Sequence, residues 1–210
     1  MTSQRARDRL CARLEEMGIR SRQVLEVMRR VPRHIFLDEA LASRAYENTA
    51  LPIGHGQTIS QPYTVARMTE ALVESGPMGR VLEVGGGCGY QTVVLSRLCR
   101  EVYTIERLRE LAGRLRRNLR ELRVHNARVL HGDGFRGWPS AAPFDAILVA
   151  AAPREVPEAL LEQLGPGGRL VIPVGPHGEQ RLLLIRRDEN GFQESELEWV
   201  SFVPLIQGRG

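Results

Sequence analysis

The stretch that decides the fold is Val81-Leu82-Glu83-Val84-Gly85-Gly86-Gly87-Cys88-Gly89-Tyr90. Four residues of strand character run directly into a cluster of glycines, and a helical pattern follows from Gln91. Because glycine has no side chain, the backbone can turn sharply at Gly85, Gly87 and Gly89, and a ligand can lie against main-chain N–H groups. This arrangement is typical of the nucleotide-binding turn of an α/β sheet. Taken alone it does not establish a site, since many glycine-rich turns bind nothing.

Two further strand ends carry acidic residues. Glu106 ends the apolar run 102–105 and comes 21 residues after Gly85. An acid about 20 positions beyond the turn can accept hydrogen bonds from ribose hydroxyls, although a plain surface charge is the alternative. Asp133, between Gly132 and Gly134, ends the third run, where it could equally be a turn residue. Together the three strand ends predict one pocket at the carboxyl edge of the sheet.

The pattern after Arg80 alternates between strands and helices. Strands are expected near 80–84, 101–105, 127–131, 144–150 and 168–174, with helices near 90–99, 107–123 and 155–164. The strands are continuous apolar runs, as in sheets that are buried on both faces, so we expect a doubly wound, mostly parallel α/β sheet. After Gly175, residues 181–187 and 197–203 predict two antiparallel strands, joined through the turn at 188–191.

The residues before the sheet are predicted to be mainly helical. Helices are expected from Ser3 to Met17, from a cap at Ser21 to Arg30, and from Pro62 to about Ser75. Residues 33–46 are partly helical, and the glycine- and proline-rich segment 51–62 is expected to be a loop. We expect a single domain over 1–210, made of N-terminal helices and an active-site loop (1–79), an α/β core (80–175) and antiparallel strands (176–210).

Composition restricts the possible chemistry. The net charge is +4 and the pI is about 9.4, yet every basic residue is arginine, so no lysine can act as a base or form a Schiff base. Seven arginines lie within 107–123, but leucines recur there every three or four positions and no aromatic residues intervene. That pattern favours an amphipathic helix over a nucleic-acid surface. We therefore expect no nucleic-acid partner.

Other features set expectations about location and metals. No apolar run approaches the roughly 18 residues that a membrane span needs, and the N-terminus has no signal-peptide core, so we expect a cytoplasmic protein without membrane contact. The three cysteines, Cys11, Cys88 and Cys99, form neither a CxxC pair nor a zinc pattern, and we expect no metal.

Five segments together resemble the protein-L-isoaspartate O-methyltransferase family, in the right order and over nearly the whole chain. The glycine turn alone would indicate only a class I S-adenosylmethionine-dependent methyltransferase with a Rossmann-like fold, whereas the segment 54–62 is specific. The segments are Val24–His34, Pro52–Pro62, Glu83–Gln91, His131–Gly134 and Phe202–Leu205.

The resemblance implies an enzyme that uses S-adenosylmethionine, yielding S-adenosylhomocysteine. It would methylate the free α-carboxylate of L-isoaspartyl residues in damaged proteins and peptides, and D-aspartyl residues more weakly. The methyl ester then collapses to a succinimide, whose hydrolysis restores some normal aspartate. We expect a monomer.

The family's residue roles also carry over by resemblance. Glu83 and the turn glycines Gly85, Gly86, Gly87 and Gly89 would hold the methionine part of the cofactor, Glu106 the ribose, and Gly132 and Asp133 the adenine. Thr58, Ile59 and Ser60 would form the lid over the methyl group and bind the substrate, with Thr58 and Ile59 also contacting the cofactor and Ser60 as the active-site residue. Val203, Pro204 and Leu205 would frame the isoaspartyl backbone.

Two positions depart from the family's pattern. The family commonly has hydroxyl residues where Gly86 and Cys88 stand here, so mostly backbone groups would hold the cofactor at this turn. Binding should survive, and its tightness is left open because an extra glycine adds flexibility that is lost on binding. Cys88 is either a small buried side chain or a thiol whose pKa is lowered by the nearby helix start.

Several alternatives stay open at the level of sequence. Ser60 could simply cap the helix that begins near Pro62. His55 could act as a general base, although a structural role in the loop is favoured. The chain could also be a class I methyltransferase for RNA, for a small molecule, or for a carboxylate in one biosynthetic peptide, or a binding module that has lost catalysis.

Overall fold

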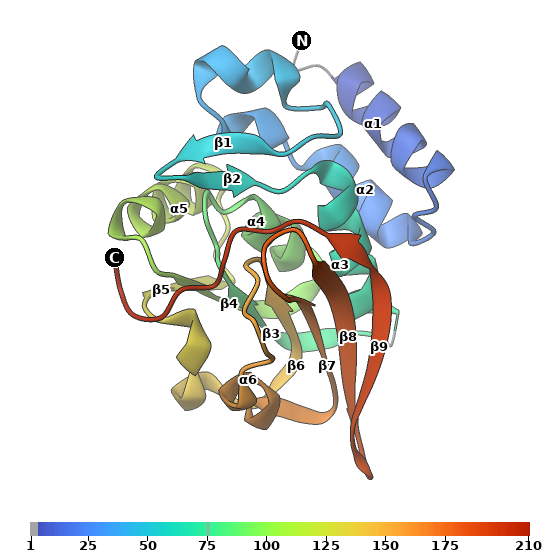
Figure 1. Cartoon of the computed structure of the whole chain (residues 1–210). Coiled ribbons are helices and arrows are strands. Elements are labelled where there is room, and N and C mark those ends of the chain that lie inside the picture. The colour runs from blue at the N-terminus through green and yellow to red at the C-terminus, as the bar shows by residue number, and fades with distance from the viewer. Residues whose placement is uncertain (1–3, 75) are drawn as a thin grey trace.

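The computed structural model describes residues 4–74 and 76–210, and its centre is a seven-stranded sheet (Figure 1). The strand order is β5-β4-β3-β6-β7-β8-β9. Strands β3 to β7 are parallel, and β8 and β9 continue the sheet antiparallel, which confirms the predicted fold class. The strands are β3 (Met78–Val84), β4 (Cys99–Glu106), β5 (Ala127–His131), β6 (Phe144–Val149), β7 (Leu164–Val174), β8 (Gln180–Asp188) and β9 (Gly191–Val200).

Helices cover both faces of this sheet. The helix expected over 90–99 ends at Ser96, and the one expected over 155–164 spans only Glu158–Glu162. Ser21 caps the second helix, where its hydroxyl accepts a hydrogen bond from the Val24 N–H (3.4 Å). The expected helix ends at Ser3 and Ser75 lie outside the described residues. The helices are α1 (Gln4–Glu16), α2 (Arg22–Arg30), α3 (Pro62–Val73), α4 (Tyr90–Ser96), α5 (Arg109–Glu121) and α6 (Glu158–Glu162), with 3₁₀ turns η1 (Arg33–Phe36), η2 (Glu39–Arg44), η3 (Gly134–Arg136) and η4 (Pro139–Ala141).

The apolar strands feed two separate cores. Val81 and Val102 face the helices α1 to α5, whereas Leu82, Tyr103 and Ile147 face α6 and η4. Successive side chains of a strand point to opposite faces, so a strand buried on both sides reads as an unbroken apolar run. None of the helices in the described part of the chain has the length and apolar character of a membrane-spanning segment.

The expectation of a loop over 51–62 was wrong in part. This segment contains β1 (Leu51–Gly54) and β2 (Gln57–Ile59), which pair antiparallel. His55 and Gly56 form the connection, with φ angles of 54° and 68°. Positive φ at both positions is the signature of the tight turn that joins hairpin strands. Strands this short, rich in glycine and proline, leave no periodic signal.

The last strand also differs from the prediction. β9 begins at Gly191, the last residue of the predicted turn, rather than at Leu197, and it ends at Val200 rather than Val203. It is an edge strand and its first half is largely exposed, so its sequence lacks the apolar residues on which strand prediction depends. Val203 to Leu205 leave the sheet and run beside Ala152 instead.

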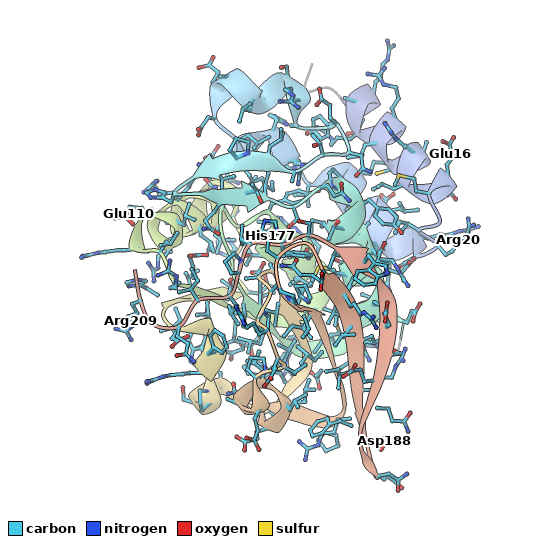
Figure 2. All side chains as sticks on the ribbon, viewed as in Figure 1. Glu16, Arg20, Glu110, His177, Asp188 and Arg209 are labelled. Carbon is cyan, nitrogen blue, oxygen red and sulfur yellow. The ribbon has the colours of Figure 1, made fainter. Side chains whose placement is uncertain are left out.

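The β1–β2 hairpin and the C-terminal segment that follows β9 both lie across the carboxyl edge of the sheet. In Figure 1 the chain after β9 crosses this edge toward α5 and β5, below the β1–β2 hairpin. Figure 2 shows Asp188 at the tip of the β8–β9 hairpin, at the opposite end of the sheet from His177. Arg114 of α5 holds β1, since its guanidinium donates to the Ile53 carbonyl (3.1 Å) and the Phe36 carbonyl (2.9 Å).

Candidate active site

A cavity opens at the carboxyl edge, and three distant parts of the sequence form its walls. The glycine turn and the end of β4 form its floor, the β2 segment one wall, and the C-terminal segment the other. The predicted site residues that line it are Thr58, Ile59, Ser60, Gly85, Gly86, Gly87, Glu106, Val203, Pro204 and Leu205. The structure therefore brings together most of the residues that the sequence singled out.

The glycine turn has the geometry that its sequence predicts. Gly85 and Gly87 have φ angles of 89° and 54°, which side chains rarely allow. The N–H groups of Gly85 and Gly86 both donate to the Ile105 carbonyl (2.9 and 3.1 Å), which fixes the turn against β4. Gly89, with φ of 92°, precedes the first residue of α4 and lies outside the cavity lining. Its positive φ angle allows the backbone to turn into α4.

Glu106 joins two turns at the cavity floor. Its Oε2 accepts a hydrogen bond from the Gly87 N–H and its Oε1 one from the Leu108 N–H, both at 2.8 Å. The residue is only 6% exposed, so a plain surface charge does not describe it. A carboxylate offers about four lone-pair sites. Two therefore remain for donors in the cavity, as a ribose with two hydroxyls would require.

Glu83 lies behind the turn rather than in the cavity. It is fully buried, is absent from the lining, and its Oε2 accepts a hydrogen bond from the Thr92 hydroxyl (2.5 Å). Burial raises the pKa of its carboxyl group to about 7, against the opposing effect of the Thr92 hydroxyl. The family resemblance suggests that Glu83 contacts the methionine part of the cofactor, but Glu83 does not line the cavity. Glu83 instead supports the turn through α4.

The third strand end is arranged differently from the prediction. Gly132 and Asp133 lie outside the cavity lining, and Gly134 lines it. Asp133 caps η3, with Oδ1 accepting from the Phe135 N–H (2.9 Å) and Oδ2 from the Gly208 N–H (2.8 Å). The turn interpretation of Asp133 therefore matches the geometry. Its carboxylate also fixes the C-terminal segment beside the cavity.

Ser60 does not cap a helix. The residue at the N-cap of α3 is Gln61, which makes no side-chain capping bond, and Pro62 is the first helical residue. Ser60 is half-buried and lines the cavity. His55 is exposed at the tip of the hairpin and lies outside the lining, which matches the structural role favoured for it.

The C-terminal wall is held by main-chain bonds. The Ala152 N–H donates to the Val203 carbonyl (2.8 Å) and the Leu205 N–H donates to the Ala152 carbonyl (2.9 Å). Pro204 has no N–H. The Val203 carbonyl and the Leu205 N–H are thus paired with Ala152, which fixes this segment beside the cavity.

Comparisons with known proteins agree with this site. A family model described as protein-L-isoaspartate(D-aspartate) O-methyltransferase matches residues 5–210. The chain belongs to this family. It is 56% identical over 208 residues to a protein-L-isoaspartate O-methyltransferase of Pseudomonas fluorescens, with 99% of both chains covered. It is 57% identical over 209 residues to one of Halorhodospira halophila, covering 100% of this chain and 95% of that one.

Solved structures give the same result. A protein-L-isoaspartate O-methyltransferase superposes with a TM-score of 0.86 at 28% identity, covering 97% of this chain and 67% of that chain. A Plasmodium falciparum protein described in the same terms, solved in complex with S-adenosyl-L-homocysteine, gives a TM-score of 0.80 at 28% identity, covering 94% and 96%.

The two departures from the family's pattern have structural explanations. A Cβ atom at Gly86 would lie 2.4 Å from both Leu115 Cδ1 and Thr104 Oγ1, so these two side chains fill the space of a residue there. Cys88 is buried, and burial raises the pKa of its thiol. The alternative of a lowered Cys88 pKa was therefore wrong, since loss of solvation outweighs the helix start.

Some lining residues had not been predicted. Ala150 and Ala151 follow β6, the fourth strand to end at this edge. Because parallel strands end at the same edge of the sheet, these two residues could have been predicted in the same way as Glu106. Tyr90 and Gln91 directly follow the glycine turn, whereas Ile53 carries no such signal because only the tertiary fold brings it to the cavity. Within the described residues no group of three or more histidine, cysteine or acidic side chains is arranged to hold a metal ion.

The buried Glu83 predicts a specific pH dependence. Its carboxyl group titrates near 4.5 when unfolded and near 7 when folded, so the folded state keeps a proton that the unfolded state loses. Its contribution to stability is full below pH 4.5 and is lost as the pH rises to 7. Relative to Glu83→Gln, the wild-type free energy of unfolding should fall by about 3 kcal/mol across this window. Chemical denaturation of both proteins over this range measures it, and a constant difference would contradict the assignment.

Proposed function

We propose that this chain transfers a methyl group from S-adenosylmethionine to the free α-carboxylate of L-isoaspartyl residues in proteins and peptides, and more weakly to that of D-aspartyl residues. One observation carries the proposal beyond family membership. Ser60 lines the cavity above the glycine turn and also a second cavity, bounded by the start of α3 and the end of β9. A hydroxyl at this junction can meet both a cofactor on one side and a peptide on the other.

The cofactor fits the first cavity on the chemistry of its residues. The free lone pairs of Glu106 suit two ribose hydroxyls, and a Cβ at Gly87 would lie 3.4 Å from Ile53 Cδ1, so the glycines keep the floor open. We assign direct cofactor contacts to the lining residues Thr58, Ile59, Gly85, Gly86, Gly87, Glu106 and Gly134. Glu83, Gly89, Gly132 and Asp133 act by holding those residues in place.

The acceptor needs no catalytic base. A peptide α-carboxyl has an intrinsic pKa of roughly 3.5, so it is ionised and nucleophilic at neutral pH. S-adenosylmethionine, when bound, supplies a methyl group on a positively charged sulfur. The protein's task is to align the carboxylate, which is worth several kcal/mol in well-oriented systems. His55, exposed at the hairpin tip, is not needed as a base.

Ser60 is the residue that we assign to alignment. Its hydroxyl can donate to one carboxylate oxygen and leave the other free to attack. Because the anionic charge of the carboxylate disappears in the reaction, a neutral donor holds it without the strong ground-state stabilisation that an arginine would give. After transfer, the following backbone nitrogen displaces methanol from the ester to give a succinimide, and hydrolysis of that ring restores some aspartate.

Paired peptides test the proposed function. The protein is incubated with methyl-labelled S-adenosylmethionine and two peptides that differ only in aspartyl or isoaspartyl linkage, and with RNA in a third reaction. The isoaspartyl peptide should be labelled and its aspartyl twin should not, because only the former presents an α-carboxylate on a short arm. Equal labelling of the two peptides, or labelling of RNA alone, would refute the proposal.

Replacing Ser60 tests the alignment role. Ser60→Ala should lower kcat roughly 10- to 100-fold, the value of one hydrogen bond to a charged group, while the affinity for S-adenosylhomocysteine stays near that of wild type. His55→Gln, at the tip of the hairpin that precedes Ser60, is the control and should change neither kcat nor its pH profile. If wild-type kcat instead rises through a histidine-like pKa and His55→Gln removes that step, His55 is the base and this mechanism is wrong.

A further inference from the structure

The second cavity has no role in cofactor binding, yet it adjoins the proposed reaction site. It shares Thr58, Ser60, Ala150 and Val203 with the first cavity and has a volume of about 550 Å³. That volume is within the range of sites that bind small ligands and is sufficient for a peptide residue with its side chain. A peptide whose isoaspartyl carboxylate reaches Ser60 therefore has space for a flanking residue here.

Glu198 is the one charged residue among the described residues that line this cavity. It lies near the end of β9, opposite Leu182 of β8, and the side chain is 28% exposed. Its Oε1 atom is buried and has no hydrogen-bond partner. The protein itself covers Oε1, so a ligand in the cavity can reach only the exposed part of the side chain, and the cavity wall carries the charge of a carboxylate at that point.

The nearest cation compensates Glu198 only in part. Arg67 Nε lies 3.8 Å from Glu198 Oε1, and the same guanidinium also pairs with Glu70 (3.4 Å). One arginine thus serves two carboxylates. Burial raises the pKa of the Glu198 carboxyl group, and neither the attraction of Arg67 nor the Tyr63 hydroxyl reverses that shift. The negative charge on the cavity wall is therefore neutralised only in part, although the whole chain carries a net charge of +4.

We propose that the second cavity binds the residue next to the isoaspartyl residue, and that Glu198 selects a basic side chain there. This inference rests on the proposed function, since it assumes an isoaspartyl peptide at Ser60. A lysine or arginine side chain is long enough to bring its cation to the exposed part of the Glu198 carboxylate, where partial burial strengthens a charge-assisted interaction. An acidic side chain in the same place is repelled.

The test compares flanking residues in otherwise identical peptides. Acetylated and amidated isoaspartyl peptides carry lysine, its uncharged analogue norleucine, or glutamate, first before and then after the isoaspartyl residue. For wild type, kcat/KM should favour lysine over norleucine by about 10-fold at one of the two positions, with glutamate below norleucine. The preference should weaken with added salt, because salt screens a partly exposed pair.

Two variants show whether Glu198 is the cause. In Glu198→Gln the ratio of lysine to norleucine should fall to about 1, and this ratio within one variant does not depend on how much protein is active. Glu196→Gln is the matched control on the same strand, because Glu196 is bonded to Arg181 (2.8 Å) and does not line the cavity. It should keep the wild-type ratio.

The outcomes separate this inference from the function on which it rests. If wild type fails to methylate even the norleucine peptide, the proposed function itself is refuted. If that peptide is methylated but lysine is favoured at neither position, or if Glu198→Gln keeps the preference, the function stands and the role of Glu198 is refuted.

Discussion

The site depends on one carboxylate that bonds two main-chain turns. Glu106 stands at the end of β4 and accepts the N–H groups of Gly87 and Leu108. The first belongs to the turn after β3 and the second to the turn that leads into α5, so a single side chain sets the distance between them. Hydrogen bonds to an ionised acceptor are stronger than those between neutral groups. The glycines allow the turn, and Glu106 fixes it.

Segments from both ends of the chain complete the cavity around this floor. A parallel sheet brings the ends of β3, β4 and β6 to one edge, but it leaves that edge open. Arg114 holds the β1–β2 hairpin from one side, and Ala152 holds Val203 and Leu205 from the other. Residues separated by more than a hundred positions thus enclose one space, with Ser60 where it meets the second cavity.

Much of this could be predicted from the sequence because the signals were local. The glycine turn, Glu106 at its fixed spacing and the cap at Ser21 each depend on a few adjacent residues, and the structure has all three. What was missed depends on tertiary contacts. The bond from the Gly208 N–H to Asp133 could not be predicted because it joins positions 75 residues apart, and the adenine contact of Asp133 stays a prediction. The start of β9 was missed because an exposed edge strand needs no apolar pattern.

The most direct test of this account asks whether Glu106 itself recognises the ribose. Calorimetry compares S-adenosylhomocysteine with its 2′-deoxy analogue on wild type, Glu106→Gln and Glu106→Ala. Loss of one hydrogen bond to a carboxylate should weaken wild-type binding of the analogue roughly 10- to 100-fold. Glu106→Ala should bind both ligands equally, whatever its overall affinity, with Glu106→Gln between the two. Wild type that does not distinguish the ligands, or Glu106→Ala that still does, would contradict the central role of this carboxylate.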